Sequence, residues 1–254
     1  MSGRERRGIR TLNVIEIENL NFAYGNGIRV LHNISAAVNK GEAVGMIGAN
    51  GAGKSTLLKL LVGLADGYEG SIRFDKFMVE KKNLAAIRSR IGYVFQDSES
   101  QLFLSTVYED VAFGPENYGY SKEEVDRRVM EALGKVHLEE LKDRQIYRLS
   151  GGQKKLASIA TILSMEPEVI LLDEPSVALD PKNRRNLIHI LNEMEETKII
   201  ASHDLDMIWD TCTRTILLCR GKIVKDGKTE EILKDRELLE ANGLELPLSM
   251  QRKI

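Results

Sequence analysis

The chain has 254 residues, of which 43% are hydrophobic and 29% are charged, and its net charge is −2. This composition is typical of a soluble globular protein with room for one large domain or two modest ones. The balanced charge gives no overall attraction to nucleic acid or acidic lipid. No stretch reaches the roughly 18 apolar residues that cross a bilayer, so a role in transport would need a membrane path from another chain.

The N-terminal segment 1–12 is rich in arginine and lacks the apolar core of a secretory signal. We expect it to be a disordered basic tail. The two cysteines, Cys212 and Cys219, have no metal-ligand spacing. They indicate reduced thiols in a cytosolic protein.

Hydrophobic periodicity then predicts strands and helices in alternation. Apolar and charged residues alternate over 14–18, which favours a half-exposed strand. The apolar run 43–47 leads into a glycine-rich loop, and helical spacing follows over 54–64. Another strand is expected at 91–95. This order of strand, loop and helix is the setting in which a phosphate-binding loop is found.

The segment 97–165 has a mainly helical pattern. Thr106 and Ser121 are each followed three residues later by glutamate, which is the capping-box pattern of a helix start. Helical spacing also follows Ser150. We therefore expect a helical subdomain inserted between strands of the core.

The last part of the chain returns to strands. Asp180 followed by Pro181 is typical of a helix start, here towards Met194. The alternation indicates a mostly parallel α/β core, and a charged extension is expected at 227–254. The strands expected here are 169–173, 198–201 and 215–219.

The loop 48–55, with the sequence GANGAGKS, fits the phosphate-binding pattern G-x-x-x-x-G-K-[ST]. Its glycines let backbone N–H groups point at phosphate oxygens, and the following helix adds its positive dipole end. Lys54 is expected to reach the β- and γ-phosphates of ATP, and the Ser55 hydroxyl to coordinate Mg²⁺. The predicted nucleotide-binding residues of this loop are Gly48, Ala49, Asn50, Gly51, Ala52, Gly53, Lys54, Ser55 and Thr56.

Two adjacent acids, Asp173 and Glu174, end the apolar strand 169–173. A buried parallel strand delivers its terminal carboxylates to the sheet edge where α/β proteins bind ligands. We expect Asp173 to hold Mg²⁺ through water, as the second metal-anchoring acid of P-loop enzymes, and Glu174 to polarise the attacking water. The alternative for Glu174 is a surface glutamate at a strand end.

Three further residues are candidates for the same site. Gln96 follows a strand at the entrance to the helical segment and is expected to contact Mg²⁺ and nucleotide; His203 follows another strand and is expected to sense the γ-phosphate. Tyr24 is expected to stack on adenine. The alternatives are a structural histidine and a tyrosine that only packs.

A second glycine motif, Leu149 to Gln153 with the sequence LSGGQ, opens a helix. Uncovered N–H groups beside a serine hydroxyl make an anion receptor, although the chain already has one in its phosphate loop. Together with that loop, Gln96, the acidic strand, Asp180 and His203, it resembles the ATP-binding cassette (ABC) ATPase domain over residues 13–226.

The resemblance implies a P-loop NTPase fold with an α/β core, an N-terminal antiparallel β region, the helical subdomain and a short C-terminal helical extension. It also implies an ATPase that works as a head-to-tail dimer with Mg²⁺. Each ATP would lie between the phosphate loop of one subunit and the LSGGQ motif of the other, and Asp180 would link the two sites. The residues expected to contact the ATP of the partner are Ser150, Gly151, Gly152, Gln153 and Asp180.

A finer resemblance lies in the stretch Gln96 to Glu116 and in the late segment 238–247. Both are similar to the ATPases of energy-coupling factor importers, most of all those for cobalt and nickel. This implies an ATPase at the cytoplasmic face of the plasma membrane that powers uptake of a metal ion or a vitamin. An integral membrane scaffold would dock near 96–116, a small membrane protein would capture the substrate, and no nucleic acid is expected.

Leu156 stands where that family has a basic residue, and Ser176-Val177-Ala178 replaces its usual Thr-Ala-Gly. The extension 227–254 is either a dimerisation segment or a solvated appendage. Two other functions stay open, a non-transport ABC ATPase that acts on DNA and a soluble nucleotide-dependent regulator. The partner ATPase is either an identical copy or a paralogue.

Overall fold

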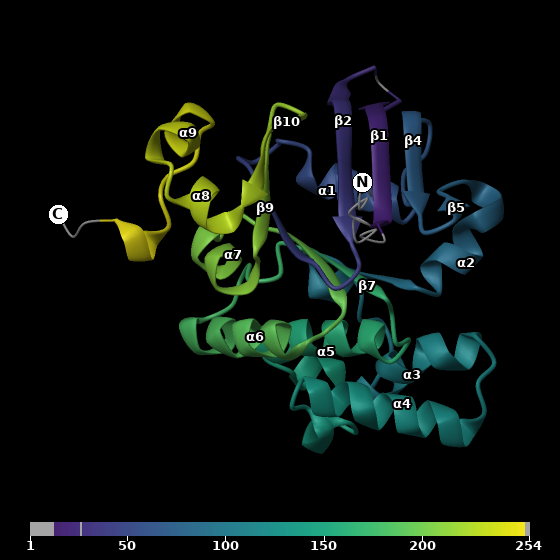
Figure 1. Ribbon diagram of the computed structural model, residues 1–254. Coiled ribbons are helices and arrows are strands. Elements are labelled where there is room, and N and C mark those ends of the chain that lie inside the picture. Colours follow the sequence, from purple (N-terminus) through teal and green to yellow (C-terminus); the bar gives the residue numbers. More distant parts are fainter. Residues whose placement is uncertain (1–12, 26, 252–254) are drawn as a thin grey trace, which may run out of the picture.

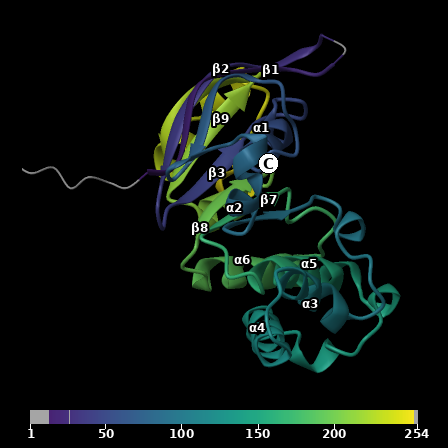
Figure 2. The ribbon, with the colours of Figure 1, turned by 90° about the vertical axis from the view of Figure 1, so that its right-hand side faces the viewer.

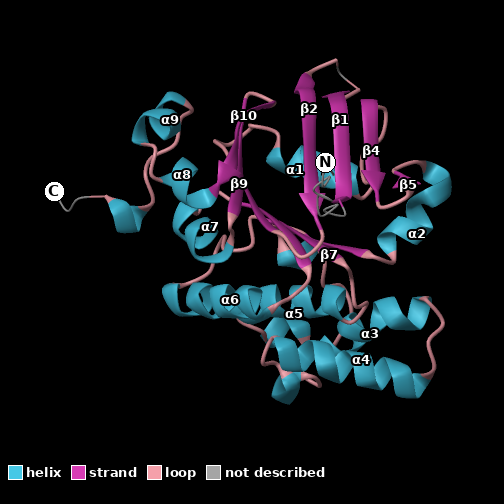
Figure 3. Ribbon diagram, in the orientation of Figure 1, coloured by secondary structure: helices cyan, strands magenta, loops and turns pink. Residues whose placement is uncertain are grey.

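The computed structural model describes residues 13–25 and 27–251, so the expected basic tail at 1–12 lies outside the described residues. Two β-sheets occupy one half of the molecule, and a group of helices lies beneath them (Figures 1 and 2). The distribution of helices and strands in Figure 3 confirms the predicted α/β architecture with an inserted helical subdomain.

The larger sheet has six strands, and all but its outermost strand pair in parallel. Five strands lie where the sequence predicts them, within one residue at either end. The sixth was not predicted, and it ends two residues beyond the expected end of the core at 226. In spatial order the strands are β10 (Lys222–Lys228), β9 (Arg214–Cys219), β3 (Ala43–Ile47), β8 (Thr197–Ala201), β7 (Val169–Asp173) and β6 (Ile91–Val94).

The smaller sheet is antiparallel and forms the expected N-terminal β region. Its first strand extends well beyond the predicted 14–18. The other three strands have weaker alternation and were not placed from the sequence. In spatial order they are β2 (Arg29–Asn39), β1 (Asn13–Ala23), β4 (Glu69–Phe74) and β5 (Phe77–Met78).

Helices cover both faces of the six-stranded sheet. Helix α1 packs in a hydrophobic layer between the two sheets, and α3 to α9 contribute to a second layer on the opposite face. The helices are α1 (Lys54–Leu61), α2 (Leu84–Arg88), α3 (Val107–Asn117), α4 (Lys122–Lys135), α5 (Gly151–Leu163), α6 (Pro181–Glu193), α7 (Leu205–Thr211), α8 (Thr229–Leu233) and α9 (Arg236–Ala241).

Strand alternation decides which side chains face each layer. In β7, Val169 and Leu171 pack in the layer that contains α1, whereas Ile170 and Leu172 pack in the helical layer. Because successive side chains of a strand point to opposite faces, Asp173 continues the row of Val169 and Leu171. The strand thus aims its terminal carboxylate towards α1.

Caps fix the ends of the inserted helices. The Thr106 hydroxyl accepts from the Glu109 N–H, and the Glu109 carboxylate accepts from the Thr106 N–H, so the predicted capping box forms. Ser121 also caps its helix. The Glu124 carboxylate instead binds arginines of its own helix, so this box closes on one side only.

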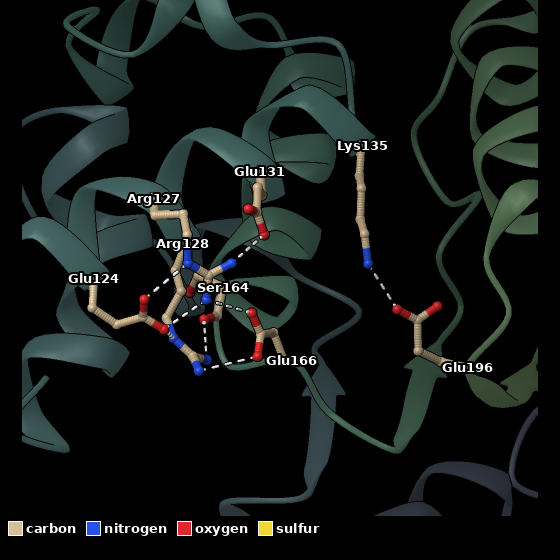
Figure 4. A network of polar contacts seen from close by, with 8 residues as sticks. All are labelled: Glu124, Arg127, Arg128, Glu131, Lys135, Ser164, Glu166 and Glu196. Atoms are coloured by element: carbon tan, nitrogen blue, oxygen red, sulfur yellow. Dashed lines mark hydrogen bonds and ion pairs between the residues drawn. The ribbon is translucent and has the colours of Figure 1, made fainter.

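A network of ion pairs ties α4 to its surroundings (Figure 4). Arg128 donates to Glu124 at 2.7 Å and lies 3.0 Å from Glu166, which follows α5. Lys135, at the end of α4, donates to Glu196, just before β8, at 2.9 Å. Single exposed pairs contribute little, but together these contacts fix the helical subdomain against the core.

The C-terminal extension packs on its own chain. Ile232, Leu233 and Leu239 of α8 and α9 are buried in the helical layer. Beyond α9, the N–H groups of Leu248 and Ser249 donate to the Asp206 carboxylate at 2.8 and 3.1 Å. The buried side chains of α8 and α9 therefore face the core of their own chain.

Gly92 marks a close approach of β6 to α5. A Cβ atom at this position would lie 1.7 Å from Cγ2 of Ile162. We expect Gly92→Ala to lower the free energy of unfolding by about 1–3 kcal/mol, because the packed helix must shift. Urea unfolding measures this change.

Gly134→Ala in α4 is the control, because the nearest atom to its new Cβ is Oε1 of Glu139 at 3.5 Å. It should leave stability unchanged or raise it by about 0.5–1 kcal/mol. Equal stability of Gly92→Ala and the wild type would contradict this view of the β6–α5 contact.

Candidate functional site

The carboxyl ends of three neighbouring parallel strands meet at one edge of the six-stranded sheet. Strand β3 pairs with β8, and β8 pairs with β7. The glycine-rich loop 48–53 follows β3, Glu174 follows β7, and His203 comes soon after β8. The topology thus joins three of the predicted site segments that lie far apart in the sequence.

The loop after β3 needs glycine at particular positions. A Cβ atom on Gly48 would lie 2.3 Å from the Leu218 carbonyl oxygen, and one on Gly53 would lie 2.7 Å from Cδ2 of Leu31. Gly53 also has a φ of 105°, which L side chains rarely adopt. The loop therefore keeps its backbone free of side chains where α1 begins, which suits an oxyanion ligand.

Lys54 is almost completely buried, with 6% of its surface exposed. Its Nζ donates to the Gly48 carbonyl oxygen at 2.7 Å and lies 3.4 Å from Oε1 of Glu174. The first contact bends the lysine back over its own loop. Its charge is thereby held at the centre of the loop, where a phosphate group would lie.

Glu174 joins this lysine to the third strand end. Its Oε2 accepts from the His203 N–H at 3.1 Å and lies 2.7 Å from His203 Nδ1. Glu174 has a φ of 47°, a left-handed conformation that costs a non-glycine residue about 1–3 kcal/mol. The conformation turns the chain sharply before Pro175 and keeps the carboxylate at the sheet edge.

Asp173 and Ser55 supply oxygen atoms at one point. The Ser55 hydroxyl donates to Oδ1 of Asp173 at 2.8 Å, and Asp173 is buried. Hydroxyl, carboxylate and phosphate oxygens are the ligands that Mg²⁺ prefers. The described part of the chain contains no cluster of three or more His, Cys, Asp or Glu that could hold a metal alone. The donor set therefore fits a Mg²⁺ that is shared with phosphate oxygens.

A cavity of ≈ 1790 Å³ opens above these groups. It is larger than the roughly 300–1,000 Å³ of a typical small-molecule site. Tyr24 and Gln96 line it, and both are exposed. The Tyr24 hydroxyl lies 3.1 Å from Thr56 Oγ1, which places an aromatic ring beside the glycine-rich loop. The lining residues predicted from the sequence are Tyr24, Asn50, Gly51, Ala52, Gly53, Lys54, Ser55, Thr56, Gln96, Glu174 and His203.

The LSGGQ motif lies elsewhere. Ser150 to Gln153 do not line this cavity and begin α5, where Ser150 and Gln153 form a capping box. Asp180 caps α6, and its carboxylate accepts from the Asn183 N–H at 2.8 Å. A Cβ on Gly152 would lie 2.5 Å from Cγ of Asn183, so the starts of α5 and α6 lie together. The cavity and the exposed LSGGQ motif are thus two candidate surfaces of one chain, and the start of α6 borders both, because Pro181 lines the cavity.

Lys155 connects these two surfaces. It is 3% exposed, and its Nζ donates to the carbonyl oxygens of Phe95 and Gln96 at 3.0 and 2.7 Å. Gln101 accepts from the Phe95 N–H at 3.1 Å and donates to Ser158 of α5 at 2.6 Å. Burial lowers the pKa of Lys155 to about 8. Helix α5, which starts at Ser150, is therefore fastened to the backbone that carries Gln96.

Arg184 connects the α6 surface to the strand-end cluster. Its guanidinium donates to both carboxylate oxygens of Asp204, one of them at 2.7 Å. Asp204 follows His203 and caps α7. Sequence analysis missed Lys155, Gln101 and Arg184, because ordinary polar side chains give no signal of contacts across the fold.

The departures from the family pattern have local explanations. Leu156 is 5% exposed in the helical hydrophobic layer, so an apolar residue suits its position. Ala178 has a φ of 63°, in the left-handed region where glycine would cost less. The segment before Asp180 thus carries backbone strain that the usual glycine would avoid.

The sequence model of the ABC transporter family matches residues 31–177. The chain belongs to the ABC transporter family. A relative from Gloeobacter violaceus, provisionally named an ABC transporter ATP-binding protein, is 48% identical over 238 residues, which cover 93% of this chain and 98% of that one. The energy-coupling factor transporter ATP-binding protein EcfA of Carboxydothermus hydrogenoformans is 42% identical over 237 residues, with coverages of 92% and 87%.

Solved structures of ABC proteins agree with this assignment. CbiO1 from Clostridium perfringens, described as part of the ABC transporter complex cbiONQ, is 35% identical, with a TM-score of 0.81 and coverages of 90% and 94%. A dimeric ATP-binding cassette in a post-hydrolysis state, bound to ADP and Pi, is 28% identical, with a TM-score of 0.75 and coverages of 85% and 98%. This ABC chain therefore has an ATPase domain of the ATP-hydrolysing kind.

The effect of the Lys155 contacts on ATP turnover can be tested by substitution. Lys155→Met keeps the length of the side chain and removes the charged donor to the carbonyl oxygens of Phe95 and Gln96. We expect ATP turnover to fall about tenfold, which corresponds to about 1.4 kcal/mol of activation free energy. Affinity for ATP should stay unchanged, because the 48–55 loop is intact.

Lys154→Met is the matched control, since the ion pair of Lys154 within the described residues is with the exposed Glu99, and such pairs contribute little. Steady-state ATPase rates and equilibrium ATP binding measure the two effects. Equal turnover of the two variants would show that the Lys155 contacts do not position Gln96.

Proposed function

We propose that this chain is the ATP-hydrolysing subunit of an energy-coupling factor importer. The observation that carries the enzymatic part is the convergence of Lys54, Glu174 and His203 at three strand ends. ATP would bind with its phosphates on the 48–55 loop and its adenine on the exposed ring of Tyr24. Lys54 would then contact the β- and γ-phosphates instead of Glu174.

Hydrolysis follows from the same geometry. Once Lys54 has turned to the phosphates, the Glu174 carboxylate can accept a hydrogen bond from the attacking water. His203 hydrogen-bonds to Glu174 and would contact the γ-phosphate. Ser55, Asp173 and Gln96 would hold Mg²⁺, which neutralises charge that develops on the phosphate oxygens.

The second part of the proposal is a dimer of two ATPase subunits. Ser150 and Gly151 are exposed, and the LSGGQ motif does not line the cavity of its own chain. The cavity is also larger than one small ligand requires. The LSGGQ motif of a second subunit, together with its Asp180, would complete the site, in line with the dimeric cassette described above. The partner is an identical copy or a paralogue.

The C-terminal extension 227–254 would add to this dimer. Since its buried side chains pack on the core, a second subunit would meet its outer side. There Leu248 is 77% exposed. This segment lies beside the ATP cavity, because Leu248 is among the residues that line it.

An exposed aromatic group on the helical subdomain supports a membrane partner. Phe103 and Phe113 are 62% and 43% exposed and stack edge to face with centroids 4.9 Å apart. Both lie in the stretch 96–116 that resembles importer ATPases. Among the residues that the structure describes, no helix is long and apolar enough to cross a membrane. An integral membrane scaffold would dock on this aromatic pair at the cytoplasmic face of the plasma membrane.

The proposed cargo is a transition metal ion, cobalt or nickel, or a vitamin, captured by a small membrane protein. The names of EcfA and of the cbiONQ complex support this class of importer. A role on DNA is not favoured, because the longest helix of the described chain, α4, has only 14 residues. ATPases of that class need long coiled coils between their two halves.

Phe103→Asp tests the membrane partnership. The substitution replaces one ring of the aromatic pair with a charge, which would be unfavourable in an apolar interface. Recovery of the scaffold should fall at least tenfold when the tagged chain is co-expressed with the membrane proteins encoded beside its gene. ATP turnover and melting temperature of the isolated chain should not change, because Phe103 lies outside the ATP cavity.

Val224→Asp is the control, since Val224 is 44% exposed on β10, far along the chain from the aromatic pair. Blue-native electrophoresis with mass spectrometry measures the recovered complex. A scaffold recovered equally with wild type and Phe103→Asp would contradict docking on the pair. Recovery of DNA instead of a membrane protein would contradict the importer.

A further inference from the structure

The Tyr93 hydroxyl forms a buried hydrogen bond to the acidic end of the neighbouring strand. It donates to Oδ2 of Asp173 at 2.9 Å, and Tyr93 and Asp173 are 7% and 3% exposed. In the parallel pair of β6 and β7, Tyr93 lies beside Leu171. Asp173 follows Leu171 by two residues, so strand alternation brings both polar groups to the same face.

The Tyr93 ring packs against an aromatic neighbour. It contacts Phe95 edge to face, with centroids 4.8 Å apart and an interplanar angle of 85°. Because a carboxylate oxygen accepts hydrogen bonds, the Tyr93 hydroxyl is the donor in this contact.

The Asp173 carboxylate is thus divided between two partners. Oδ2 accepts from Tyr93, whereas Oδ1 accepts from Ser55. A free carboxylate can rotate about its last bond, but one with a fixed donor on Oδ2 presents Oδ1 in one direction. That direction is towards Ser55, the other oxygen expected to hold Mg²⁺.

We propose that Tyr93 is a positioning residue for the Mg²⁺ that accompanies ATP, because its hydroxyl aims Oδ1 of Asp173 at the point that Ser55 also faces. The inference rests on the proposed function. Mg²⁺ demands near-ideal octahedral geometry, so an outer partner that fixes the direction of an oxygen contributes to affinity. Mutation of a residue that hydrogen-bonds to a metal ligand typically lowers metal affinity about 10–100-fold.

The alternative is a tyrosine that only packs in the hydrophobic layer around α1. Tyr93→Phe separates the two roles, because it retains the ring and its contact with Phe95 while removing the hydroxyl. Mn²⁺ serves as the probe metal, and electron paramagnetic resonance of free Mn²⁺ in the presence of a non-hydrolysable ATP analogue gives the metal affinity. The Kd for Mn²⁺ should rise about tenfold or more, with ATP affinity in excess EDTA and melting temperature near those of the wild type.

Tyr68→Phe is the matched control, since the Tyr68 hydroxyl donates to the Val79 carbonyl oxygen at 2.6 Å, away from the cavity. It should leave Mn²⁺ affinity unchanged. An Mn²⁺ affinity of Tyr93→Phe within twofold of the wild type, with ATP still bound in EDTA, would overturn the inference alone. A wild-type chain that binds no ATP would overturn the proposed function and this inference with it.

Discussion

A buried carboxylate between two cationic or polar partners is the constraint on which the site depends. The Glu174 side chain is 8% exposed, and it lies between Lys54 and His203. A charge removed from water in this way is strongly unfavourable unless it is paired. The three residues follow three different strands, so this pairing requires β3, β7 and β8 to end at the same sheet edge.

The same constraint explains how a phosphate group could change the site. A triphosphate on the glycine-rich loop would offer Lys54 a stronger partner than Glu174 and would free that carboxylate. Two contacts link this cluster to neighbouring helices. Arg184 of α6 binds the residue after His203, and Lys155 of α5 binds the backbone of Gln96. The start of α5 at Ser150 is thereby joined to the cavity without lining it, whereas α6 lines the cavity from its first residue, Pro181.

Motif spacing made the core of the site predictable. A glycine-rich loop between strand and helix has few structural alternatives, and two acids at the end of an apolar strand have one natural place in a parallel sheet. The caps at Thr106, Ser150 and Asp180 were also readable, because a cap is a local contact.

Contacts between distant segments were not predictable from this single sequence. The hydrogen bond from Tyr93 to Asp173 depends on β6 lying beside β7, and the order of strands in a sheet cannot be inferred from local periodicity. Strand β10 was also not predicted, because its residues are mostly charged and its partner β9 is a separate strand. The packing of the C-terminal extension on the core through Leu233 and Leu239 likewise depends on contacts between distant segments. The capping box at Ser121 closed only in part, because Glu124 found arginine partners on its own helix.

The central role of the Glu174 carboxylate can be measured directly with Glu174→Gln, which keeps the side-chain shape and removes the charge. ATP binding and single-turnover hydrolysis should be followed on the same preparation. We expect ATP affinity equal to or higher than that of the wild type, because Lys54 no longer has a competing anion, and hydrolysis at least a hundredfold slower. Hydrolysis within threefold of the wild-type rate would contradict the assignment of Glu174 as the group that activates water.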